Sequence, residues 1–106
     1  MINIFASLSV VILSHIFGMY GLYKYRMFQQ ATHLVGGIFF GYLGVYYGFN
    51  PVATALVGGA IWEIFEFLVG TFLPRFARKI CWYSDTFDGA FSDIFMGVAG
   101  SSLLLL

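Results

Sequence analysis

The chain has 106 residues, five basic and five acidic side chains, and a formal net charge of zero. Apolar residues make up 60% and charged residues 9%, against roughly 45–50% and 25% in ordinary globular proteins. A single domain of this size, residues 1–106, has too little interior to hide so much apolar surface from water. The composition therefore favours an integral membrane protein. It also argues against a nucleic-acid partner and, with one cysteine, excludes an internal disulfide framework.

Four apolar stretches are each close to the roughly 20 residues that a helix needs to cross a bilayer. In chain order they cover residues 2–23, 31–49, 51–73 and 88–106. The first has no positive region before it and no clear cleavage site, so we interpret it as a retained span. Asn50-Pro51 predicts a turn between the second and third stretches, and Pro74 ends the third. We expect an all-α bundle of four transmembrane helices.

All basic residues fall in two of the connections between these stretches, as Lys24 and Arg26, and as Arg75, Arg78 and Lys79. With four spans, both connections lie on the same side of the membrane. The positive-inside rule makes that side cytoplasmic. We therefore expect loops 24–30 and 74–87 in the cytoplasm and both termini on the outer side.

Small and polar residues form a stripe along each of the last three stretches. Residues three and four apart share a helix face, and small residues let membrane helices approach closely. The stripes are His33, Gly37, Gly41, Gly44 and Gly48; Gly59, Glu63, Glu66 and Gly70; and Ala90, Asp93, Gly97 and Gly100. The first stretch carries a weaker version, Ser7, Ser14, Gly18 and Gly21. These faces predict one acidic cavity inside the bundle, open to the cytoplasmic leaflet.

All acidic residues fall within 62–93, and some stand where the sequence otherwise predicts hydrocarbon. Carboxylates in such places face a bundle interior or a water-filled cavity. Two of them close together in a low dielectric do not both ionise easily without a cation. The alternative is that Glu63 and Glu66 are protonated and structural. The metal hypothesis names as ligands Glu63, Glu66, Asp88 and Asp93, with Mg²⁺, Mn²⁺ or Ca²⁺ as the ion.

Other roles follow from position. If the protein is an enzyme, which the sequence leaves open, the candidate catalytic residues are His33, Glu66 and Asp93, with His33 as a proton carrier. Asp85 is interpreted as a helix cap or part of the site rim. Arg75 and Arg78 are candidates for binding a lipid phosphate head group.

These polar residues resemble those of the small bacterial membrane proteins grouped as YjdF-like and, more distantly, VanZ-like. The resemblance covers roughly residues 31–101 and maps onto His33, Glu63, Glu66, Asp85, Thr86, Asp88, Asp93, Gly97 and Gly100. VanZ-like proteins tend to have an asparagine where this chain has Met96, and an arginine nearer to Asp85 than Arg78. The YjdF-like group is therefore the better fit. The resemblance implies a bacterial inner-membrane protein, and its VanZ-like side suggests cell-envelope lipids.

Three functions remain open at this point. The first is a metal-dependent acidic site that binds or processes a lipid phosphate. The second is a non-catalytic small subunit whose acidic residues pair with a larger membrane partner, or with further copies of the chain. The third is a proton or cation pathway, for which the outer half of the bundle lacks a carboxylate.

Overall fold

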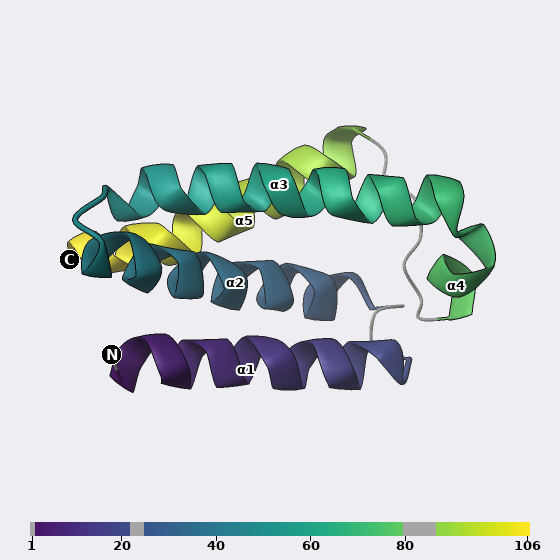
Figure 1. Cartoon of the computed structure of the whole chain (residues 1–106), viewed down its shortest axis with the longest axis horizontal. Helices are drawn as coiled ribbons and strands as arrows, with labels where there is room; N and C mark the ends of the chain where they lie inside the picture. Colours follow the sequence, from purple (N-terminus) through teal and green to yellow (C-terminus); the bar gives the residue numbers. More distant parts are fainter. Residues whose placement is uncertain (1, 22–24, 80–86) are drawn as a thin grey trace.

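The computed structural model describes residues 2–21, 25–79 and 87–106, without the side chains of 78, 79 and 87–90. The described chain is all-α (Figure 1). Its helices are α1 (Ile2–Met19), α2 (Arg26–Tyr46), α3 (Pro51–Phe72), α4 (Pro74–Lys79) and α5 (Phe87–Ser102), followed by the 3₁₀ turn η2 (Leu103–Leu105). The expected helical bundle is confirmed, and the short helix α4 occupies part of a segment for which we predicted a loop.

The turn between α2 and α3 forms as the sequence predicts. Gly48 has a φ of +81°, and the Phe49 N–H donates to the Gly44 carbonyl at 2.7 Å, which closes α2. Asn50 then caps α3, because its Oδ1 accepts hydrogen bonds from the N–H groups of Val52 and Ala53. Pro51 at the first helical position has no N–H to leave unsatisfied. This connection makes α2 and α3 antiparallel neighbours.

The helix α2 lies in the middle of the bundle and contacts α1, α3 and α5 (Figure 1). Its buried residues are small, namely Thr32, Gly37, Gly41 and Gly44. The two chain termini lie at one end of the bundle and α4 at the other (Figure 1). That arrangement agrees with the expectation that both termini share a side.

Two of the described helices, α1 and α3, are long and apolar enough to cross a membrane, not the four that we predicted. The helix α5 has only 16 residues. The helix α2 has 21 residues, but it begins at Arg26 rather than at Ala31 and so includes polar residues at its start. The expectation was wrong on this point because these two helices do not coincide with the apolar stretches: α2 takes in polar residues before its stretch, and α5 ends before its stretch does.

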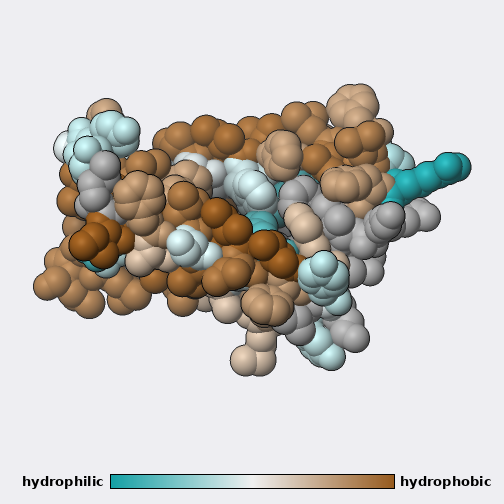
Figure 2. Space-filling model, turned by 60° about the horizontal axis from the view of Figure 1, so that its bottom comes forward, coloured by the Kyte–Doolittle hydropathy of each residue, from teal (hydrophilic) through white to brown (hydrophobic). Residues whose placement is uncertain are grey.

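The bundle is apolar outside and small or polar inside. Among the described residues, the buried polar side chains are Ser7, Thr32, Asp93 and Ser101, whereas the buried hydrophobic ones are Ala55 and Ala77. Large side chains such as Phe67, Phe72 and Phe95 are exposed on the outer faces, and most of the face drawn in Figure 2 is apolar. This distribution is the reverse of that in a water-soluble domain, which rarely exposes such large apolar patches.

Candidate metal centre

Three side chains from three helices converge inside the bundle. His33 of α2 has its Nε2 atom 3.2 Å from Asp93 Oδ2 of α5 and 3.9 Å from Glu63 Oε1 of α3. One candidate ligand atom from each residue lies within 4.8 Å of the others. Asp93 is 1% exposed and Glu63 is 11% exposed. The structure therefore brings together one imidazole and two carboxylates that are 30 and 60 residues away from it in the sequence.

Close packing of α2 against α5 sets the distance between His33 and Asp93. Gly37 and Gly97 meet backbone to backbone, so that a Cβ at Gly37 would overlap the Gly97 carbonyl. One turn further on, a Cβ at Gly100 would overlap the Leu34 carbonyl. The glycine stripes predicted from the sequence thus allow this approach, as small residues do in membrane bundles.

The cluster lies inside the bundle rather than at its mouth. Because α2 begins at Arg26, His33 stands seven residues, about 10 Å, into the helix. The five residues before Ala31 are helical, so His33 lies deeper in its helix than the predicted start of the stretch at residue 31 implies. The polar first turns of α2 therefore lead from the end of the bundle to the cluster.

Arg26 and Gln30 belong to these polar turns, and neither was predicted as a site residue. The Arg26 guanidinium lies 3.7 Å from Asp93 Oδ1, and Gln30 Nε2 donates to Ser92 Oγ at 3.2 Å. Both residues continue the His33–Gly37 stripe at spacings of four and three. The signal was therefore present in the sequence, but interpreting Arg26 only as a topology determinant concealed it.

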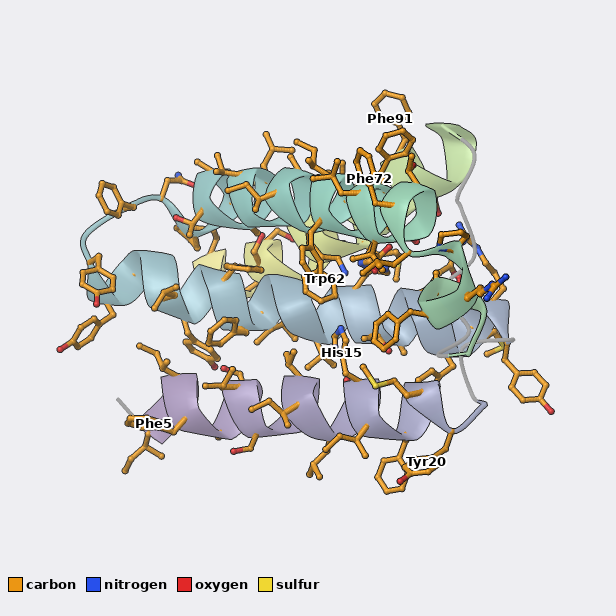
Figure 3. The ribbon with its side chains drawn as sticks, turned by 45° about the vertical axis from the view of Figure 1, so that its right-hand side comes forward. Phe5, His15, Tyr20, Trp62, Phe72 and Phe91 are labelled. Atoms are coloured by element: carbon orange, nitrogen blue, oxygen red, sulfur yellow. The ribbon has the colours of Figure 1, made fainter. Side chains whose placement is uncertain are left out.

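Glu66 lies outside the three-residue cluster, one turn beyond Glu63 on α3. The Nε1–H of Trp62 donates to Glu66 Oε1 at 2.5 Å. The Trp62 ring also makes an edge contact with the His15 ring of α1, at 5.1 Å between centroids. Figure 3 shows His15 pointing from α1 towards Trp62. This ring contact joins α1 to α3 within the chain.

A cavity of about 510 Å³ adjoins the cluster. Its lining includes His33, Asp93 and Glu66 at one part, and apolar side chains of α1 and α2 elsewhere. A cavity between the helices is thus present, but its lining is mostly apolar rather than acidic. Its opening to the cytoplasmic leaflet stays a prediction.

The remaining predicted site residues divide into two groups. Arg75 is described and lies exposed on α4. Asp85 and Thr86 lie outside the described residues, as do the side chains of Arg78 and Asp88. The roles predicted for these residues stay predictions.

The cluster geometry suits a metal ion. Metal–ligand bonds of about 2.1 Å place adjacent ligand atoms roughly 3.0–3.5 Å apart, and His33 Nε2 lies 3.2 Å from Asp93 Oδ2 and 3.9 Å from Glu63 Oε1. Small rotations of Glu63 would complete the set. Three protein ligands leave at least one coordination position open, as in catalytic rather than structural zinc sites. Among the described residues, the cluster contains the predicted ligands Glu63 and Asp93 and adds His33, whereas the side chain of the predicted ligand Asp88 lies outside them.

Comparisons with protein-family models, curated proteins and solved structures find no match to this chain. The resemblance to YjdF-like and VanZ-like proteins therefore stays a prediction from the residues quoted for it.

Proposed function

We propose that this protein is a small integral membrane protein that binds a divalent cation at His33, Glu63 and Asp93 and, through it, the phosphate of a lipid head group. The convergence of these three side chains inside an apolar bundle carries the proposal. Placing carboxylates there without compensation is costly. A divalent cation compensates the two of them and gives their position a function.

Embedding of the bundle in the membrane is supported by its apolar exterior and by α1 and α3. The longest extent of the structure is 39 Å, close to the roughly 40–45 Å of a bilayer with its head-group regions. In this arrangement the exposed first turn of α2, with Arg26, lies at the end of the bundle and so at the level of the head groups. The basic residues orient the end that carries α4 towards the cytoplasm.

The mixed ligand set favours some ions over others. Imidazole suits zinc and other transition metals, whereas Mg²⁺ and Ca²⁺ prefer oxygen ligands. Ca²⁺ also takes six to eight ligands as a rule, roughly twice what the cluster offers. We therefore propose Mn²⁺ or Zn²⁺ in preference to the Mg²⁺ or Ca²⁺ that carboxylates alone suggest.

A phosphate fits the electrostatics of the occupied site. A divalent ion offsets the charges of Glu63 and Asp93, and the Arg26 guanidinium next to Asp93 adds a positive charge. Guanidinium and metal ions both bind phosphate oxygens well. Arg26 is 45% exposed, so it can reach a ligand that enters from the cytoplasmic end of the bundle.

Ion titration of the detergent-purified protein tests the cation site. We expect Mn²⁺ or Zn²⁺ to raise the stability of the parent by about 2.7 kcal/mol at a hundredfold excess over the dissociation constant. His33→Gln, Glu63→Gln and Asp93→Asn should lose most of this gain. Glu66→Gln is the matched control, since it removes a carboxylate one turn outside the cluster and should retain the gain.

Two results would contradict the cation site. One is the absence of any ion-specific stabilisation in a parent protein that unfolds cooperatively. The other is an equal loss of the ion-induced stabilisation in Glu66→Gln and Glu63→Gln, which would show a diffuse electrostatic effect rather than ligation.

A further inference from the structure

The cavity beside the cluster has the dimensions of a ligand site. Its volume of about 510 Å³ falls within the roughly 300–1,000 Å³ typical of small-molecule pockets. Residues from α1, α2, α3 and α5 line it. The helices α1 and α3 flank α2 in both ribbon views (Figures 1 and 3).

The two parts of the cavity differ in chemistry. His33, Asp93 and Glu66 line the part next to the cluster. The rest of the lining includes the polar side chains His15, Gln29 and Thr32 and a larger apolar group, which consists of Val11, Ile12, Ile16, Met19, Phe39, Phe40, Ala55 and Trp62. A free phosphate or a bare ion would use only the polar part. A ligand that fills the whole space needs a charged end and a hydrocarbon body.

The cavity is bounded on one side by the helix α1, whose own outer residues are apolar. Ile12 and Ile16 line the cavity and are also about half exposed at the surface. The His15–Trp62 ring contact bridges α1 and α3 at this point. In a membrane, Ile12 and Ile16 therefore face hydrocarbon on one side of α1 and the cavity on the other, so the apolar part of the cavity adjoins the lipid.

We propose that this cavity binds the hydrocarbon chain of a phosphate-bearing lipid whose phosphate lies at the His33–Glu63–Asp93 cluster. The inference rests on the proposed function and adds the binding site of the hydrocarbon chain to it. A cation at the cluster would complement the phosphate, and the apolar side chains of the cavity lining favour this occupant over a water-soluble phosphate. The membrane supplies such a ligand at high local concentration.

Gly36 provides a direct way to block the cavity. It lines the cavity, and a Cβ built on it has no atom within 4 Å. A Gly36→Leu side chain would therefore occupy cavity space without displacing the backbone. Gly70 of α3 also has open space around its Cβ position but does not line the cavity. Gly70→Leu is thus the matched control for a new leucine in a membrane helix.

Trp62 reports on occupation because it lines the cavity. The chain has two tryptophans, so Trp82→Phe leaves Trp62 as the only indole. The probe is a long-chain lysophosphatidic acid with two bromine atoms on the chain, which quenches indole fluorescence on contact. The companion probes are the corresponding dibrominated alcohol and inorganic phosphate as a competitor. Measurements are made in detergent with the stabilising ion present.

We expect the brominated lysophosphatidic acid to quench Trp62 fluorescence saturably. Gly36→Leu should lower its apparent affinity at least about tenfold, equivalent to 1.4 kcal/mol, and Gly70→Leu should leave this affinity unchanged. Equal quenching of the parent and of Gly36→Leu would overturn the inference. If Gly36→Leu fails to fold, Val11→Phe blocks the cavity from α1 and serves in its place. If the dibrominated alcohol quenches Trp62 as strongly as the phosphate does, the phosphate contributes nothing to binding, which would contradict its contact with the cluster.

The two proposals fail in different ways. Full displacement of the brominated lipid by inorganic phosphate alone would show that free phosphate is the ligand. This result would overturn the binding of a hydrocarbon chain in the cavity but not the cation site. If no ion stabilises the parent, the cation site fails. Quenching that is sensitive to Gly36→Leu would then still establish a chain-binding cavity. Ion stabilisation of Gly36→Leu also shows that this variant is folded.

Discussion

His33 Nε2 lies 3.2 Å from Asp93 Oδ2 across the interface at which Gly37 meets Gly97 backbone to backbone. The imidazole and the carboxylate are each four residues, about one helical turn, from the glycine of their own helix. The separation of the two polar side chains therefore depends on the separation of the two backbones. Helix packing and ligand geometry are coupled at this point, so a change in one should alter the other.

Gly37→Ala should weaken both the fold and the cation site. Its methyl group would overlap the Gly97 carbonyl, so α2 and α5 would have to separate, at a cost of about 1–3 kcal/mol. Gly36→Ala is the neighbouring control, with open space at its Cβ position. It should be neutral, or stabilising by up to about 1 kcal/mol, because glycine is unfavourable within a helix. Denaturant unfolding in detergent and ion titration measure the two effects; equal behaviour of the two variants would contradict this packing.

Cation binding should weaken as the pH falls. A ligating imidazole must be neutral and ligating carboxylates must be ionised, so protons compete with the metal for all three residues. The apparent affinity should therefore rise between pH 5 and 8 (roughly the range in which an unperturbed histidine loses its charge). Calorimetry in two buffers of different ionisation enthalpy would show protons released on binding. A pH-independent affinity would exclude His33 as a ligand.

The helices and their inner faces could be predicted because they depend on local patterns. The stripe that contains Gly37, and the one that contains Asp93 and Gly97, follow from a spacing of three and four residues, and Asn50-Pro51 marks the turn before α3. Each of these features acts within a few residues of the chain. The structure confirms that Gly37 and Gly97 are at a helix contact.

The members of the cluster could not be selected by the same means. Glu63 and Glu66 lie one turn apart on the same face, so periodicity alone does not show which one reaches His33. The structure places Glu63 in the cluster and gives Glu66 the Trp62 indole N–H as a donor. The number of membrane-crossing helices was overestimated because the polar residues before Ala31 continue α2 and lower its apolarity.

The orientation in the membrane can be measured with single cysteines. Phe49→Cys, in the exposed turn between α2 and α3, and Arg75→Cys, exposed on α4, lie at opposite ends of α3. Each is introduced with Cys81→Ser, which removes the native thiol. A membrane-impermeant maleimide should label Phe49→Cys in intact spheroplasts and Arg75→Cys only after permeabilisation. The opposite pattern would invert the topology inferred from the basic residues.

Replacement of Arg26 should affect the cation and the lipid phosphate in opposite directions. Its guanidinium lies 3.7 Å from Asp93 Oδ1, where it repels a bound cation and attracts a phosphate. In Arg26→Gln we expect the affinity for Mn²⁺ or Zn²⁺ to rise by up to about fivefold, equivalent to the roughly 1 kcal/mol that a partly exposed ion pair contributes. The affinity for lysophosphatidic acid should fall.

Arg75→Gln is the control for Arg26→Gln, since it removes the same charge from an exposed position on α4. If Arg75 only orients the protein, the variant should bind the ion and the lipid as the parent does. A loss of lipid affinity in Arg75→Gln, with ion affinity unchanged, would instead support the head-group role predicted for this residue. A fall of both affinities in Arg26→Gln would show that Arg26 stabilises the cluster, and would contradict a guanidinium that acts on the phosphate.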